Sequence, residues 1–136
     1  MDRRFFLAGI AGTALLPRIA WAVTGTPYTP GLVEAELAAG KTVFLDFYAN
    51  WCTTCRAQGR VISALLEENP AYGEAISFVS VDWDVHRGAE LTQRLQIPRR
   101  STLVVLKGEE ELGRIVAGTR KADIQALMDT ALAASA

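Results

Sequence analysis

Cysteine and histidine are scarce in this chain, whose 136 residues include two cysteines and one histidine. A tetrahedral structural zinc site needs four ligands, and these three residues cannot supply four from nitrogen and sulfur alone. Basic residues are not in excess either, because 14 lysines and arginines are opposed by 15 aspartates and glutamates. The composition therefore predicts no structural zinc site, and it shows no clustered basic stretch that would indicate nucleic-acid binding.

Long apolar runs are also missing, since the longest begins at Phe5, ends at Leu16 and has only about twelve residues. Such a run is too short for an ordinary transmembrane helix. Arginines precede it, and Ala20-Trp21-Ala22 follows it as a small-residue cleavage site. This order predicts a signal peptide at residues 1–22 that is cleaved after Ala22.

The export route follows from the residues around the two arginines. Arg3-Arg4-Phe5-Phe6-Leu7 is similar to a twin-arginine export motif. The general secretory route and an uncleaved anchor remain alternatives. All three would deliver the domain outside the cytoplasm, and we expect it in a periplasm.

The remaining chain has the composition of one globular domain, because half of the residues are hydrophobic and 21% are charged. Threonine, glycine and proline dominate residues 23–31, which we interpret as an extended linker. We predict a single domain at residues 32–136, and we expect it to be a monomer.

Apolar periodicity divides this domain into alternating helices and strands. Helices are predicted at residues 32–39, 53–69, 89–95 and 122–133, and strands at 43–48, 76–82, 102–107 and 112–117. A strand–helix–strand unit is thus followed by two strands and a helix. This order predicts an α/β fold, in which a central mixed sheet of four strands has helices on both faces.

The two cysteines, Cys52 and Cys55, have the spacing C-x-x-C and lie between a predicted strand and a predicted helix. At a helix N-terminus, free amide groups and the helix dipole favour a thiolate over a thiol. A thiolate at Cys52 could attack a disulfide, and Cys55 could then resolve the mixed disulfide. A structural disulfide would close only a short loop and stabilise little, and metal ligation would need further ligands. The spacing therefore favours a redox pair.

The segment from Phe44 to Arg56 (Phe-Leu-Asp-Phe-Tyr-Ala-Asn-Trp-Cys-Thr-Thr-Cys-Arg) resembles the active-site region of thioredoxin. The resemblance continues through the segment 102–108 and Gly118 into the last helix. It implies a thioredoxin-like fold and a thiol–disulfide oxidoreductase that acts on protein thiols and disulfides without an organic cofactor.

The same segment also looks like the exported domain of membrane reductant conduits, which implies reduction rather than oxidation and a membrane-bound reductant donor. The alternative is a protein that binds or transfers a soft metal such as copper through the two cysteines.

Asp46 lies inside an apolar strand, where burial would raise the pKa of its carboxyl group. The resemblance implies that Asp46 accepts the proton of Cys55, whereas an exposed edge position is the alternative. Trp51 would shield the disulfide and offer apolar surface to a substrate, unless it is a core tryptophan. We interpret Asp82 and Asp84, which flank Trp83 at the end of the second strand, as turn caps.

Ser101 departs from the family, because aligning the strand 102–107 places it where thioredoxins have a cis-proline. A cis bond before a residue other than proline costs about 2.5–4 kcal/mol, so we expect a trans Arg100–Ser101 bond. The Ser101 hydroxyl is expected to reach a cysteine sulfur as a weak donor, and the opening over the thiols is expected to be wider. Arg100 is a candidate for binding an acidic partner, with a solvated loop as the alternative.

Overall fold

The structure is a computed structural model that describes residues 25–136. The predicted signal peptide, residues 1–22, lies outside the described residues. Within the described part of the chain, no helix is long and apolar enough to cross a membrane.

Strands and helices alternate along most of the chain, as predicted. The strands are β1 (Thr26–Pro27), β2 (Thr42–Tyr48), β3 (Ile76–Asp82), β4 (Thr102–Lys107) and β5 (Glu110–Val116). The helices are α1 (Leu32–Ala38), α2 (Thr53–Glu68), α3 (Ala71–Ala75), α4 (Trp83–His86), α5 (Glu90–Arg94) and α6 (Lys121–Ala134). Helices α3 and α4 were not predicted, because these short segments contain no two large apolar residues at a helical spacing, such as Leu91 and Leu95 in the predicted helix 89–95.

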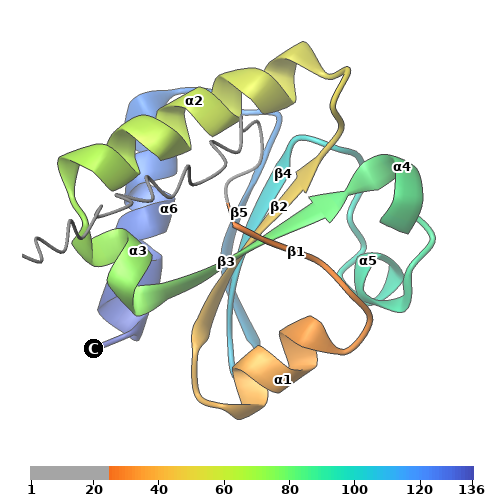
Figure 1. The fold of residues 1–136 in the computed structure, drawn as a ribbon, viewed down its shortest axis with the longest axis horizontal. Coiled ribbons are helices and arrows are strands. Elements are labelled where there is room, and N and C mark those ends of the chain that lie inside the picture. The colour runs from red at the N-terminus through yellow and green to blue at the C-terminus, as the bar shows by residue number, and fades with distance from the viewer. Residues whose placement is uncertain (1–24) are drawn as a thin grey trace, which may run out of the picture.

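The strands form one mixed sheet in the order β1-β3-β2-β4-β5 (Figure 1). β3 runs parallel to both β1 and β2, whereas the β2–β4 and β4–β5 pairs are antiparallel. The sheet thus has five strands rather than the predicted four. The additional strand, β1, lies within the segment predicted as a linker.

Strand β1 forms because the outer edge of β3 has unpaired backbone groups that a neighbouring segment can satisfy. Thr26 and Pro27 pair with Val79 and Ser80, and the next amide, of Tyr28, donates to the Ser80 carbonyl oxygen at 2.8 Å. The Tyr28 side chain is buried in the core, with 7% of its surface exposed. Two residues that include a proline show no strand period, so only the pairing itself reveals the strand.

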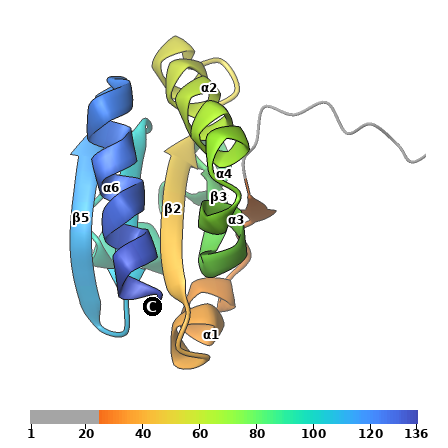
Figure 2. The ribbon, with the colours of Figure 1, turned by 90° about the vertical axis from the view of Figure 1, so that its left-hand side faces the viewer.

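Helices cover both faces of the sheet, as predicted: α2, α3 and α6 lie on one face, and α1 and α5 on the other (Figures 1 and 2). Side chains of β2 alternate between two cores. Val43, Leu45 and Phe47 pack on the side of α1 and α5, and Phe44 packs beneath α2 and α6. Asp46 has the parity of Phe44, so it lies on the α2 side of the sheet.

The topology brings several loops to one edge of the sheet, the edge formed by the ends of its strands rather than by an outer strand. Because β2 and β3 are parallel, their last residues, Tyr48 and Asp82, are paired neighbours at this edge. Thr102, the first residue of antiparallel β4, pairs with Phe47 and lies at the same edge. The loops that follow β2 and β3 and the loop that precedes β4 therefore converge there, at the carboxyl ends of β2 and β3.

Candidate active site

The two cysteines lie at this edge, where α2 begins. Cys52 is the N-cap residue of α2, and its Sγ accepts a hydrogen bond from the Cys55 amide at 3.2 Å. Neither thiol is in a disulfide. Both residues are buried, with 3% of Cys52 and 6% of Cys55 exposed, so the wider opening expected over the thiols is not found.

Ser101 lies against both thiols. Its Oγ is 3.1 Å from the Cys52 Sγ and 3.0 Å from the Cys55 Sγ, and the residue is fully buried. The Arg100–Ser101 peptide bond is trans, as predicted, since no peptide bond within residues 25–136 is cis. Ser101 has a φ of 62°, and a proline ring, which requires a φ near −65°, would not fit this backbone.

The backbone of Ser101 is held from two sides. Its amide donates to the Phe47 carbonyl oxygen at 2.7 Å, and its own carbonyl oxygen accepts from the Ala117 amide at 2.8 Å. The Gln58 side chain donates to the same carbonyl oxygen at 3.0 Å. Such a set of bonds can hold a serine in the left-handed region, which residues other than glycine rarely occupy.

Gln58 is a site residue that the sequence reasoning missed. Its Nε2 also donates to the Gly118 carbonyl oxygen at 2.9 Å, while its Oε1 is buried without a hydrogen-bond partner. Both partners of Nε2 are carbonyl oxygens, so the orientation of the amide is determined. A signal was present in the sequence, because Gln58 lies three residues after Cys55 and four before Ile62, on the buried face of α2.

Asp46 is buried, with 6% of its surface exposed, and is not at an exposed edge. Burial, and secondly the negative charge of Cys52, raise the pKa of its carboxyl group to about 7. Its Oδ1 has no hydrogen-bond partner. A carboxyl group with this pKa changes its protonation state near neutral pH, so it can accept and release a proton there.

Trp51 is at the surface, with 55% of its area exposed, and is not a core tryptophan. Its indole Nε1 donates to both carboxylate oxygens of Asp84, at 2.9 and 3.2 Å. The guanidinium of Arg100 lies 4.4 Å from the centre of the Trp51 ring, in a cation–π contact. Asp84 therefore orients the tryptophan, whereas the sequence predicted a turn cap there. Asp82 is the N-cap of α4, as predicted.

The surroundings of the two thiols shift their pKa values in opposite directions. Burial disfavours the Cys52 thiolate, but hydrogen bonds from the Cys55 thiol and from Ser101 outweigh it. With further hydrogen bonds from the Cys55 amide and from Arg100, they lower the pKa of Cys52 to about 7. Burial, and then the interaction with Cys52, raise the pKa of Cys55. Near neutral pH the arrangement thus supplies a thiolate at Cys52 and a thiol at Cys55.

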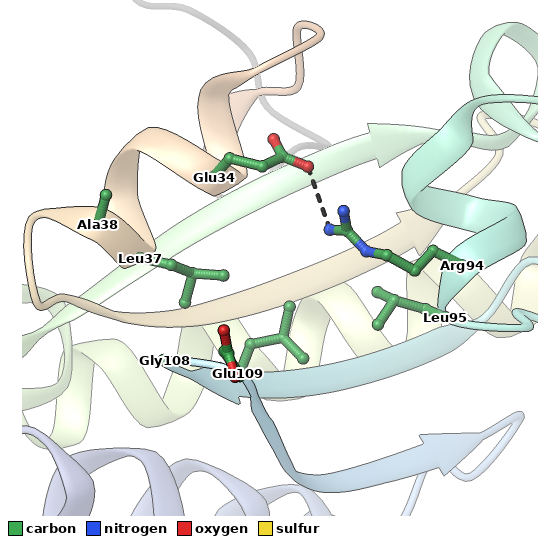
Figure 3. Close-up of a pocket in the computed structure, with 8 residues that line it drawn as sticks. Glu34, Leu37, Ala38, Arg94, Leu95, Gly108 and Glu109 are labelled. Carbon is green, nitrogen blue, oxygen red and sulfur yellow. Dashed lines mark hydrogen bonds and ion pairs between the residues drawn. The ribbon is translucent and has the colours of Figure 1, made fainter.

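A separate hollow of about 590 Å³ lies at the other end of the sheet (Figure 3). Leu37, Leu95 and Leu106 line it, and an ion pair of 3.1 Å joins Glu34 to Arg94 at its rim. It adjoins the β4–β5 turn, next to the first residue of β2, and so it does not contribute to the cysteine site. Within residues 25–136, no group of three or more histidine, cysteine, aspartate or glutamate residues could hold a metal ion.

Comparisons with known proteins agree with this geometry. The family model described as "Thioredoxin" matches residues 29–130. The chain is 29% identical to a thioredoxin of Echinococcus granulosus over 96 residues, which cover 71% of this chain and 83% of that protein. It is 36% identical to thioredoxin H5 of Oryza sativa subsp. japonica over 93 residues, which cover 68% of this chain and 64% of that protein.

A solved structure of Trxlp from Edwardsiella tarda superposes with a TM-score of 0.65 at 28% identity, and the match covers 76% of this chain and 98% of that one. The family match, these relatives and the Cys52–Cys55 pair lead to one conclusion. The chain belongs to the thioredoxin family, and it is a thiol–disulfide oxidoreductase of the kind that acts on protein disulfides.

Proposed function

We propose that this protein is an exported reductase of protein disulfides, with Cys52 as the attacking thiolate and Cys55 as the resolving thiol. One observation carries the assignment of roles. The Cys52 Sγ accepts a hydrogen bond from the Cys55 amide at the start of α2, and it also lies, like the Cys55 Sγ, beside the Ser101 hydroxyl. These groups stabilise a negative charge on Cys52 before any substrate is present.

The reaction has two steps. The Cys52 thiolate attacks one sulfur of the substrate disulfide, and the other substrate sulfur leaves with the electron pair of the broken bond. Cys55 then transfers its proton to the Asp46 carboxylate, and its Sγ attacks the Cys52 Sγ. The first substrate sulfur leaves as a thiolate and takes a proton from solvent. The enzyme dithiol is oxidised to a disulfide, and the substrate disulfide is reduced to two thiols.

The surface around the cysteines suits an extended protein substrate. The large hydrophobic residues that are most exposed within the described chain are Trp51, Val85 and Val116. Val85 belongs to α4, which follows β3, and Val116 pairs with Thr102, next to Ser101. All three lie at the edge of the sheet that carries the cysteines. Arg100, stacked on Trp51, adds a positive charge that would favour an acidic residue near the substrate disulfide.

The location outside the cytoplasm rests on the N-terminal residues. Arg3-Arg4 before an apolar segment and the sequence Ala20-Trp21-Ala22 support export to a periplasm, with the twin-arginine route favoured. Dithiols become oxidised in such a compartment unless they are reduced again. We therefore propose a membrane-bound reductant donor as the recycling partner, and a monomeric enzyme.

Export can be tested by cell fractionation of the full chain. Changing Arg3→Lys together with Arg4→Lys should leave the protein in the cytoplasm, uncleaved, if the twin-arginine route is used. Processing that continues unchanged in the double variant would indicate the general secretory route. As an independent control, the wild-type protein should also remain unprocessed in a host strain that lacks the twin-arginine translocase.

The roles of the cysteines can be tested by trapping. Cys55→Ser should accumulate mixed disulfides between Cys52 and substrate proteins, whereas Cys52→Ser should form none. Faster alkylation of Cys55 than of Cys52 in the reduced wild type would reverse the assignment. The direction of the reaction follows from the reduction potential of the pair. A value near about −270 mV supports a reductase, and a value near about −120 mV supports an oxidase.

One observation favours the alternative of a soft-metal protein that binds copper. Cys52 and Cys55 are free thiols that face a single serine hydroxyl, with no proline ring between them and a ligand. Two thiolates suit a Cu(I) ion. A Cu(I) titration of the reduced protein against a competing chelator would distinguish the two functions. Tight binding combined with failure to reduce protein disulfides would favour the metal protein.

A further inference from the structure

The hydroxyl group of Ser101 is placed almost symmetrically between two sulfurs that differ in chemical role. It lies 3.1 Å from the Cys52 Sγ and 3.0 Å from the Cys55 Sγ. A serine hydroxyl has one proton to donate and can accept in addition. It therefore donates to one sulfur at a time, and the sulfur that carries the negative charge is the better acceptor.

In the resting dithiol, the charge resides on Cys52. The Ser101 hydroxyl then donates to the Cys52 thiolate, and the Cys55 thiol, whose hydrogen bond also lowers the pKa of Cys52, donates to the same thiolate. The hydrogen bond of Ser101 lowers the pKa of Cys52 and also acts to lower the pKa of Cys55, as expected of a hydroxyl that can donate to either sulfur. After Cys52 has attacked a substrate, its sulfur is neutral and no longer needs a donor.

We propose that Ser101 is a catalytic residue whose hydroxyl serves both steps of the exchange, donating first to the Cys52 thiolate and then to the Cys55 thiolate. The proposal rests on the proposed redox function. In the second step the Cys55 proton passes to the Asp46 carboxylate, and the Ser101 O–H rotates towards the Cys55 Sγ. That thiolate forms the bond to the Cys52 Sγ, and the substrate sulfur leaves with the electron pair of the broken bond.

The fold allows this change without movement of heavy atoms. The backbone of Ser101 is held by hydrogen bonds to Phe47, Ala117 and Gln58, and the residue is fully buried. Only the hydroxyl hydrogen must turn about the Cβ–Oγ bond, and both sulfurs are already within reach. A donor that is in place before the reaction stabilises each of the two thiolates without reorganisation.

A two-phase kinetic measurement separates the two steps. The reduced full-length protein is mixed with one equivalent of a nitrobenzoate disulfide, which releases a coloured thiolate each time one of its sulfurs leaves. The first phase reports the attack by Cys52, and the second reports the resolution by Cys55. Ser101→Ala removes the hydroxyl and keeps the Cβ, and Ser101→Gly removes both but suits the φ of 62°.

We expect both variants to slow each phase by about two- to fivefold near pH 7, because each thiolate loses a charge-assisted hydrogen bond and its fraction falls more than its nucleophilicity rises. The pH midpoint of the first phase should also rise. Thr102→Val is the matched control, since it removes a buried neighbouring hydroxyl that donates to the Arg99 carbonyl oxygen rather than to a sulfur. Its two rates should match those of the wild type.

Other results would overturn the proposal. If only the first phase is slower, Ser101 stabilises Cys52 alone and is not shared. If neither phase changes, the hydroxyl has no role in the exchange. If Ser101→Ala slows both phases but Ser101→Gly does not, backbone strain at residue 101 rather than loss of the hydroxyl explains the effect. A wild-type protein that shows no second phase would contradict the redox function itself, and with it this proposal.

Discussion

At the scale of single residues, Asp46 links the stability of the fold to pH. Its carboxyl pKa is raised from 3.8 to about 7 in the folded protein, chiefly by burial. Between these values the folded state keeps a proton that the unfolded state has lost. The free energy of unfolding is therefore highest below about pH 4. It falls as the pH rises from about 4 to about 7.

Asp46→Asn should remove this dependence. The free energy of unfolding of the reduced wild type should fall by up to about 4 kcal/mol, relative to the variant, between pH 4 and pH 8. Urea unfolding of both proteins over this range measures the difference. The variant should also resolve mixed disulfides more slowly, because the proton acceptor is lost. If the free energies of unfolding of the two proteins differ by the same amount at every pH, the pKa of Asp46 is not raised in the folded protein.

Arg100 is a positively charged residue that affects the pKa of Cys52. Hydrogen bonding from its side chain helps to lower the pKa of Cys52, and its guanidinium stacks on Trp51. In Arg100→Ala, the pH midpoint for alkylation of Cys52 should rise above its wild-type value of about 7, but by less than in Ser101→Ala, because Arg100 contributes less to the lowered pKa. Arg99→Ala is the control, since Arg99 bonds only to the Arg100 carbonyl oxygen. The same shift in both variants would point to a general charge effect.

At the scale of elements, Gln58 connects α2 to the segments that flank β4 and β5. Its Nε2 donates to the carbonyl oxygens of Ser101 and Gly118, and it is fully buried. Gln58→Met keeps the approximate volume but leaves the Gly118 carbonyl oxygen without this donor. We expect a loss of about 2 kcal/mol in the free energy of unfolding, measured with urea.

The same substitution should slow the resolution of mixed disulfides, because the backbone of Ser101 loses one of its three hydrogen bonds. Gln93→Met is the matched control: Gln93 is exposed and donates to the Gly88 carbonyl oxygen at 3.1 Å. It should change stability by less than about 0.5 kcal/mol. Equal effects of the two substitutions would mean that Gln58 contributes no more than a surface glutamine.

At the scale of the whole molecule, β1 and Tyr28 show that residues 26–28 belong to the folded domain. Tyr28 is buried in the core beneath α1, and its amide pairs with β3. A chain that begins at Gly25 should unfold at the same urea concentration as the chain that begins at Val23. A chain that begins at Leu32, or Tyr28→Ala in the longer chain, should lose about 3 kcal/mol or more. Unchanged stability on removal of residues 25–31 would make that segment a true linker.

Local features of the sequence were sufficient for the fold class and for the reactive pair. The alternation of apolar residues in β2 and β4 and the helical period of α2 and α6 depend on near neighbours in the chain. The position of Cys52 at a helix N-terminus follows from a strand, a short turn and a helix in succession. Asp46 was recognisable because a carboxylate stands out among apolar strand residues. Signals of this kind lie within a few residues of one another.

The contacts that complete the site could not be predicted in this way, because they join distant segments. Trp51 and Asp84 are 33 residues apart, Ser101 and Cys52 are 49 apart, and Gln58 and Gly118 are 60 apart. No local pattern records which of these side chains will meet. The sequence by itself determined the two thiols, their spacing and the strand–helix turn that holds them. Only the tertiary structure decided that a serine hydroxyl bridges both sulfurs and that β1 completes the sheet, because both depend on where the sheet order places separate strands.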